Sequence, residues 1–203
     1  MKTLTRGFII AFLSVSLSFG LSAQAPKSPQ IVKAQGQTAF AFLPAPININ
    51  ATNYRINLFV IRDATTGNTM LSLRAITGSG GNRTLRFVTG TIPSSDFILA
   101  PDLTSASLIT TISTSGSNFN NAEVGAFSLS ISLSWSADLI GDSVDTFVFT
   151  ERAIGSPKTS FRETFHSNGP HSDCTVTGTV GGATINSFAS LDDNRTIDIV
   201  QSK

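Results

Sequence analysis

A run of strict alternation constrains the fold of this chain more than any other feature. In residues 127 to 137, FSLSISLSWSA, apolar side chains occupy every second position from Phe127 to Trp135, and serines fill the positions between them. Because neighbouring side chains of a strand point to opposite faces, the pattern predicts a strand with one buried and one wet face. Trp135 is therefore expected inside a hydrophobic core.

Other segments rich in β-branched residues and Phe repeat this pattern at near-regular spacing. Residues 54 to 62 and 69 to 76 predict a hairpin across a loop of turn formers. Further strands are predicted at residues 31–42, 84–92, 105–113, 145–154, 158–166, 174–180, 183–190 and 195–201. No segment of ten or more residues has a helical period. We therefore predict an all-β, antiparallel two-sheet sandwich of about ten strands, with a jelly roll or a closed barrel as alternatives.

The first 25 residues have the three parts of a secretory signal peptide. Lys2 and Arg6 precede an apolar stretch at residues 7 to 21, and Ala23-Gln24-Ala25 forms an A-x-A cleavage site. Cleavage is expected after Ala23 or Ala25, which leaves residues 26–203 as a single β-sandwich domain. We expect the protein to be secreted, either outside the cell or into the periplasm.

The charge and hydropathy of the mature chain argue against nucleic acid and the membrane interior as partners. The leader carries two of the 14 basic residues and none of the 13 acidic residues, which leaves a net charge of −1. Such a balance predicts no binding to nucleic acid. No later segment is apolar enough to span a bilayer, so no membrane insertion of the mature chain is expected. The expected partner is an unidentified protein or surface ligand.

Both histidines and the only cysteine of the chain lie in FHSNGPHSDC, residues 165 to 174. Asn168-Gly169-Pro170 at its centre favours a loop between two strands. The alternation of residues 174 to 180 directs Cys174 into the core. His166, His171 and Asp173 remain as possible zinc or copper ligands, although loop histidines that bind nothing are commoner.

A second group of possible metal ligands lies in ADLIGDSVD, residues 137 to 145. Asp138, Asp142 and Asp145 surround Gly141 in what we expect to be a loop. Calcium binds carboxylate oxygens in such loops, but Asp is also an ordinary turn former. No metal or other cofactor is expected on balance, with zinc, copper or calcium as the alternatives.

Two glutamates raise the alternative of a small secreted hydrolase. Glu151 shares a predicted strand face with phenylalanines, and so does Glu163, as a pair of catalytic carboxyls would require. The competing interpretation is that Arg152 or Arg162 pairs with them near solvent. Signatures of serine hydrolases, zinc proteases and nucleotide-binding loops are absent from the sequence.

The leading functional hypothesis is a non-catalytic exported protein with a binding or structural role. The serine face of residues 128 to 136 offers an uncharged hydroxyl surface for a partner or a regular substrate, although an ordinary wet sheet face looks the same. Trp135 is expected to point inward and Tyr54 is the only tyrosine. A carbohydrate platform would therefore have to use Phe.

Overall fold

The computed structural model describes residues 30 to 78, 84 to 113, 127 to 152 and 160 to 202. The predicted signal peptide and its cleavage site lie outside these ranges. No helix in the described ranges is long and apolar enough to cross a membrane.

Nine antiparallel strands form one sheet, in the order β4-β3-β2-β1-β9-β8-β7-β6-β5. The strands are β1 (Gln30–Ile49), β2 (Thr52–Asp63), β3 (Thr69–Thr77), β4 (Thr84–Ile92), β5 (Phe97–Leu99), β6 (Ser105–Ser113), β7 (Ser128–Arg152), β8 (Ser160–Val180) and β9 (Ala183–Ser202), with a 3-10 turn η2 (Ser94–Asp96) before β5. The prediction of an all-β antiparallel fold is confirmed. The described strands form a single sheet, however, and not the two stacked sheets of a sandwich.

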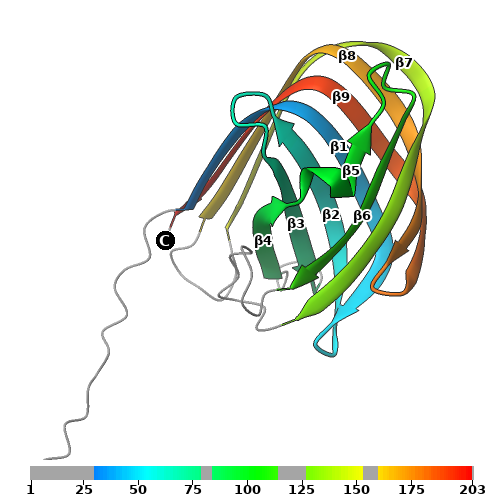
Figure 1. Cartoon of the computed structure of the whole chain (residues 1–203). Helices are drawn as coiled ribbons and strands as arrows, with labels where there is room; N and C mark the ends of the chain where they lie inside the picture. The colour runs from blue at the N-terminus through cyan, green and yellow to red at the C-terminus, as the bar shows by residue number, and fades with distance from the viewer. Residues whose placement is uncertain (1–29, 79–83, 114–126, 153–159, 203) are drawn as a thin grey trace, which may run out of the picture.

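The sheet curls because strands that are consecutive in the chain lie at its two opposite edges (Figure 1). Only Pro93 and the η2 turn separate the end of β4 from the start of β5. Arg62 of β2 contacts β5 beyond this turn: its guanidinium donates to the carbonyl oxygen of Phe97 and lies 5.5 Å from the centre of the Phe97 ring. No β4–β5 ladder is formed, so the result is an open, half-barrel-like sheet.

The main hydrophobic core fills the concave face of the curl, which we call the core face. Trp135 and Cys174 are both 2% exposed there, as the alternation predicted. The indole Nε1 of Trp135 donates to the carbonyl oxygen of Phe40 at 2.8 Å, so its polar atom is satisfied across the core. The serines between the apolar residues of β7 are exposed on the opposite side, the back face.

Strands β7, β8 and β9 are each about twice as long as the sequence predicted. Residues 166 to 173 lie within β8 and residues 137 to 145 within β7, so the two predicted loops are wrong. The turn formers in these segments are paired with neighbouring strands: Gly141 lies opposite His171, and Asp142 opposite Pro170. Tertiary pairing here overrides the local turn preference.

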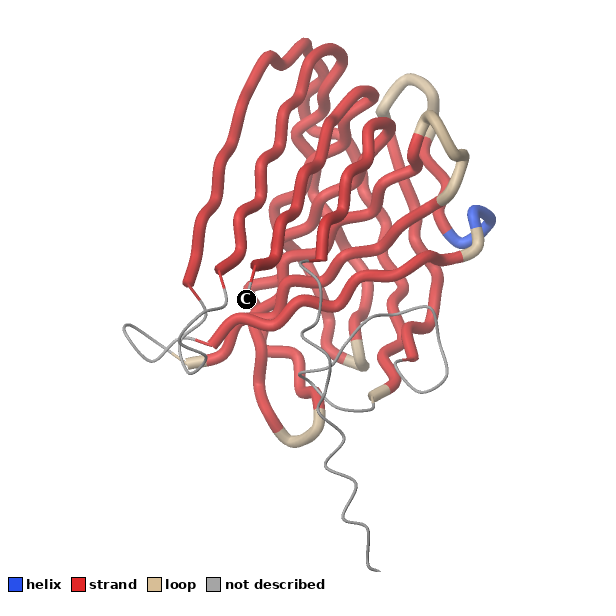
Figure 2. The backbone as a smooth tube through the Cα atoms, turned by 90° about the vertical axis from the view of Figure 1, so that its left-hand side faces the viewer, coloured by secondary structure: helices blue, strands red, loops and turns tan. Residues whose placement is uncertain are grey.

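The turn formers mark a bend in the sheet. The β1–β9 ladder shifts register between Gly36 and Thr38, and the β8–β9 ladder shifts between Ser167 and His171. Both shifts lie opposite residues 192 to 195 of β9, so they form one line across three strands. Bulges bend strands and increase their twist. The strands continue through this bend in Figure 2.

Beyond the bend, β7, β8 and β9 continue as what we call the distal segments, residues 139–152, 160–171 and 192–202. Phe165 of the distal part of β8 stacks on Phe59 of β2, with ring centroids 4.6 Å apart, although β1 and β9 separate these strands in the sheet. The distal segments therefore fold over the back face of β1 to β3. Gly36 lies at the bend and permits the close approach of β1 to β2 there, because a Cβ would collide with the carbonyl oxygen of Arg62.

Candidate functional site

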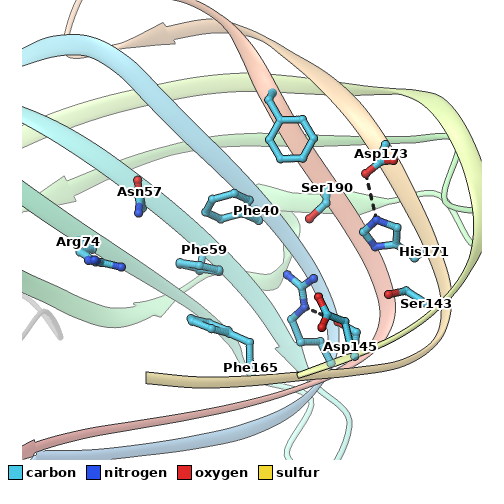
Figure 3. Close-up of a pocket in the computed structure, with 13 residues that line it drawn as sticks. Phe40, Asn57, Phe59, Arg74, Ser143, Asp145, Phe165, His171, Asp173 and Ser190 are labelled. Atoms are coloured by element: carbon cyan, nitrogen blue, oxygen red, sulfur yellow. Dashed lines mark hydrogen bonds and ion pairs between the residues drawn. The ribbon is translucent and has the colours of Figure 1, made fainter. Parts of the chain in front are cut away.

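A cavity of about 530 Å³ lies between the distal segments and the back face of β1, β2 and β3 (Figure 3). Its volume is in the range of small-molecule sites. The lining residues come from six strands: Phe40, Asn57, Phe59, Arg74, Ser143, Asp145, Phe165, Ser167, His171, Asp173, Phe188, Ser190 and Arg195.

One wall of the cavity is aromatic. Phe40 and Phe59 are in tilted contact at 4.7 Å, and Phe59 and Phe165 are stacked with only 12° between their planes. Phe59 and Phe165 are buried in a small second hydrophobic cluster. Phe188 is different, because 59% of it is exposed, and it therefore forms part of the opening.

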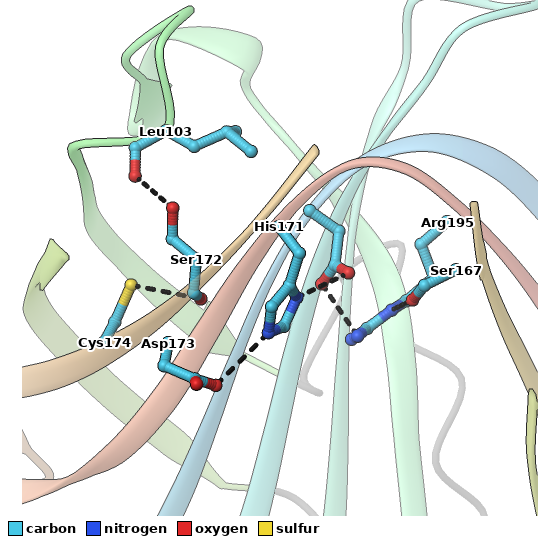
Figure 4. Close-up of polar contacts among 8 residues, drawn as sticks. Leu103, Ser167, His171, Ser172, Asp173, Cys174 and Arg195 are labelled. Carbon is cyan, nitrogen blue, oxygen red and sulfur yellow. Dashed lines mark hydrogen bonds and ion pairs between the residues drawn. The ribbon is translucent and has the colours of Figure 1, made fainter. Parts of the chain in front are cut away.

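The opposite wall carries a chain of hydrogen bonds and ion pairs along the bend (Figure 4). Arg195 donates from Nε to Ser167 Oγ at 2.9 Å, and its Nη2 lies 2.7 Å from Asp192 Oδ2. Asp192 Oδ1 lies 3.0 Å from Nδ1 of His171, whose Nε2 is 3.2 Å from Asp173 Oδ1. Asp192 is 1% exposed, so a buried carboxylate holds both the guanidinium and the imidazole in place.

The contacts of this hydrogen-bond network determine what its two basic side chains can donate. A neutral imidazole has one N–H, so His171 can donate to both Asp173 and Asp192 only when both ring nitrogens carry hydrogens. Burial lowers the pKa of Arg195, and the carboxylates of Asp192 and Asp145 oppose that shift. The guanidinium remains charged in any case.

The structure brings together two of the three residues predicted as zinc or copper ligands. His171 and Asp173 are in contact on the cavity side. His166 alternates with the cavity residues Phe165 and Ser167, so it points away, and its Nδ1 is 2.7 Å from Thr146 Oγ1. In the described ranges, no group of three or more His, Cys, Asp or Glu residues is placed to hold a metal ion.

The carboxylates predicted as calcium ligands are spread along β7. Asp138 lies at a register shift and accepts a hydrogen bond from Thr175 Oγ1 at 2.9 Å. Asp145 lines the cavity, whereas Asp138 and Asp142 do not. They are separated because the segment is an extended strand and not the expected loop.

The predicted hydrolase pair lies near the ends of the distal segments. The β7–β8 register places Glu163 opposite Phe149 and Glu151 opposite Phe161. The positions of both glutamate side chains lie outside what the structure describes.

A strip of uncharged polar residues continues from the cavity along the back face; we call it the hydroxyl strip. Its first row is Ser132, Thr179 and Thr184, and its second is Ser134, Thr177 and Asn186. The third row is Ser136 and Thr175, with the apolar Phe188 of β9 opposite Thr175. The next row contains Asp173 and Ser190, which already line the cavity. Strip and cavity are therefore one continuous surface along β8 and β9.

Sequence reasoning found part of this site and missed the rest. His171 and Asp173 stood out because histidine is rare in the chain. Residues 191 to 198, LDDNRTID, offered only a weaker version of the calcium pattern. Nothing local indicated that Asp192 and Arg195 would join His171, or that the phenylalanines would meet, since the bend alone brings them together. Comparison with known proteins identified no matching family model, no similar curated protein and no similar solved structure.

Proposed function

We propose that this protein is a non-catalytic binding protein, exported from the cytoplasm, and that its ligand occupies the cavity beyond the bend. The observation that carries the proposal is the cavity itself, about 530 Å³ with an aromatic wall facing a hydrogen-bonded polar wall. Concave sites that combine apolar surface with a few positioned polar groups are typical of small-molecule binding. The signal-like leader supports export.

The chemistry of the polar wall favours binding over catalysis. A general base needs a free nitrogen directed at the substrate, but both ring nitrogens of His171 face carboxylates. Burial raises the pKa of the Cys174 thiol to about 11, which makes it a poor nucleophile. A hydrolase using Glu151 and Glu163 is the alternative proposal, and a metal bound through His171 and Asp173 is a further one.

The proposal is tested by measuring whether small molecules stabilise the folded protein and whether the cavity is where they act. A ligand at 100 times its Kd stabilises by about 2.7 kcal/mol and so raises the Tm. We expect Ser143→Leu, which places a larger side chain in the cavity, to abolish this rise. Val144→Leu is the matched control, because Val144 is 79% exposed and alternates with the cavity-lining Ser143 and Asp145.

Intrinsic fluorescence gives a second readout. Trp135 is the only tryptophan, and its hydrogen bond to the backbone of Phe40 couples it to a residue of the cavity wall. A ligand that raises the Tm should also change the emission of Trp135. A library of neutral, cationic and anionic fragments that gives no response, or responses unchanged by Ser143→Leu, would contradict the proposal.

A further inference from the structure

The class of ligand follows from the surface that extends out of the cavity, if the cavity is a binding site as proposed. We infer that the ligand is a neutral saccharide chain, with one end in the cavity and the following units on the hydroxyl strip. Three observations carry this inference: the charge balance, the row geometry and the position of Phe188.

The cavity carries no excess of positive charge. Arg74 and Arg195 line it together with Asp145 and Asp173, and Arg195 is also paired with the buried Asp192. The rows of the hydroxyl strip contain no basic side chain. A polyanion would require an excess of basic residues. A neutral ligand has no such requirement.

The hydrogen-bonding groups also suit sugar hydroxyls, each of which both donates and accepts. The walls combine donors, such as the guanidinium of Arg195, with acceptors, such as the carboxylate of Asp145. Asn57 adds a buried amide oxygen that has no hydrogen-bond partner among the described residues. Ser, Thr and Asn side chains of the strip can serve in either role.

The rows of the strip give the ligand a direction and a length. From Thr179 to Asp173, β8 passes six residues, roughly 20 Å at about 3.4 Å per residue. Serines of β7 and polar residues of β9 lie on either side of Thr177 and Thr179. This shape fits an extended oligomer that follows β8, whereas a single sugar ring would use only the cavity.

Phe188 lies where the strip meets the cavity, because it is opposite Thr175 of the third row and also lines the cavity. Its exposure of 59% leaves much of the ring free to pack against the apolar face of a sugar. The aromatic platform therefore consists of phenylalanine, since the only tryptophan is in the core.

The test is calorimetric titration of the full exported chain with neutral gluco-, manno-, xylo- and galacto-oligosaccharides of two, four and six units. We expect one series to bind, with the hexamer about tenfold tighter than the dimer, or about 1.4 kcal/mol. Phe188→Ala should weaken both lengths. Thr177→Asp should weaken the hexamer about tenfold and change the dimer less than twofold.

Thr196→Asp is the matched control, because Thr196 is exposed and alternates with Arg195, which lines the cavity, and Ile197, which is buried in the second hydrophobic cluster. It should leave both affinities unchanged. Equal affinity for dimer and hexamer, or equal effects of the two aspartates, would overturn the inference. If charged or aromatic fragments bind in a manner sensitive to Ser143→Leu while no oligosaccharide binds, the inference fails and the proposed function stands. If nothing binds, both fail.

Discussion

Replacing Asp192 by Asn should destabilise the fold far more than an ordinary loss of a surface charge. Asp192 is 1% exposed, faces His171 and pairs with Arg195 at the bend. Asn keeps the shape of the side chain but removes its charge, so the guanidinium of Arg195, only 13% exposed, loses its buried counter-ion. Removing the charge of one partner of a buried ion pair lowers the free energy of unfolding by about 3–5 kcal/mol.

The expected effect is large against the stability of a typical domain, about 5–15 kcal/mol. For a chain of this size, 3 kcal/mol corresponds to a fall in Tm of about 6–12 °C. Asp198 provides the comparison within the same strand. Its pair with Lys33 is longer, at 3.8 Å, and both side chains are exposed, by 38% and 72%. Asp198→Asn should cost less than about 1 kcal/mol.

Urea unfolding followed by Trp135 fluorescence measures both variants against the wild type, with circular dichroism as a second probe of the transition. A double variant, Asp192→Leu with Arg195→Met, should recover much of the loss because it removes both charges. If Asp192→Asn unfolds at the same urea concentration as Asp198→Asn, the idea that a buried ion pair stabilises the bend is refuted.

Three further predictions concern other positions. Gly178→Ala should destabilise by about 2 kcal/mol, because φ is +139° and a Cβ would collide with the Ser132 carbonyl oxygen; Gly141→Ala, with open space around it, should cost much less in the same urea assay. Burial raises the pKa of the Cys174 thiol to about 11, so the thiol should react with Ellman's reagent only after unfolding. Because the unfolded thiol ionises first, the contribution of Cys174 to the free energy of unfolding should decline between about pH 9 and 11. Hydrogen bonds from Thr66 lower the pKa of Asp63. The ionised carboxylate therefore adds to the free energy of unfolding above about pH 4, and this contribution is lost on acidification. The difference in stability between wild type and Asp63→Asn should shrink at low pH.

The sequence predicted those features that depend on local alternation. Strands β4 and β6 have the bounds expected, and the burial of Trp135 and Cys174 follows from parity. The prediction failed where a turn signal lies inside a long strand. Asn168-Gly169-Pro170 resembles a connection, yet β7 pairs with all three residues, and a register shift on the β9 side accommodates them.

The candidate site was only partly predictable for the same physical reason. Phe59 and Phe165 meet because the sheet bends, and a bend arises from register shifts in several strands at once. Arg195 similarly acquires its role from Asp192 and Ser167 at that line. No periodicity within one segment encodes such contacts. Parity alone, however, already placed the serines of the hydroxyl strip on one face.

The order of the strands also determines when the molecule can be completed during synthesis. Among the described strands, every pair joins neighbours in the chain except β1 with β9, so the sheet consists of two meanders that meet along these two strands. β9, the partner of β1, is thus made after all the other described strands. Until β9 emerges, β1 and β8 each present an unpaired edge, which is the kind of surface that promotes aggregation. A nascent chain of this protein therefore exposes these two additional edges until β9 is available.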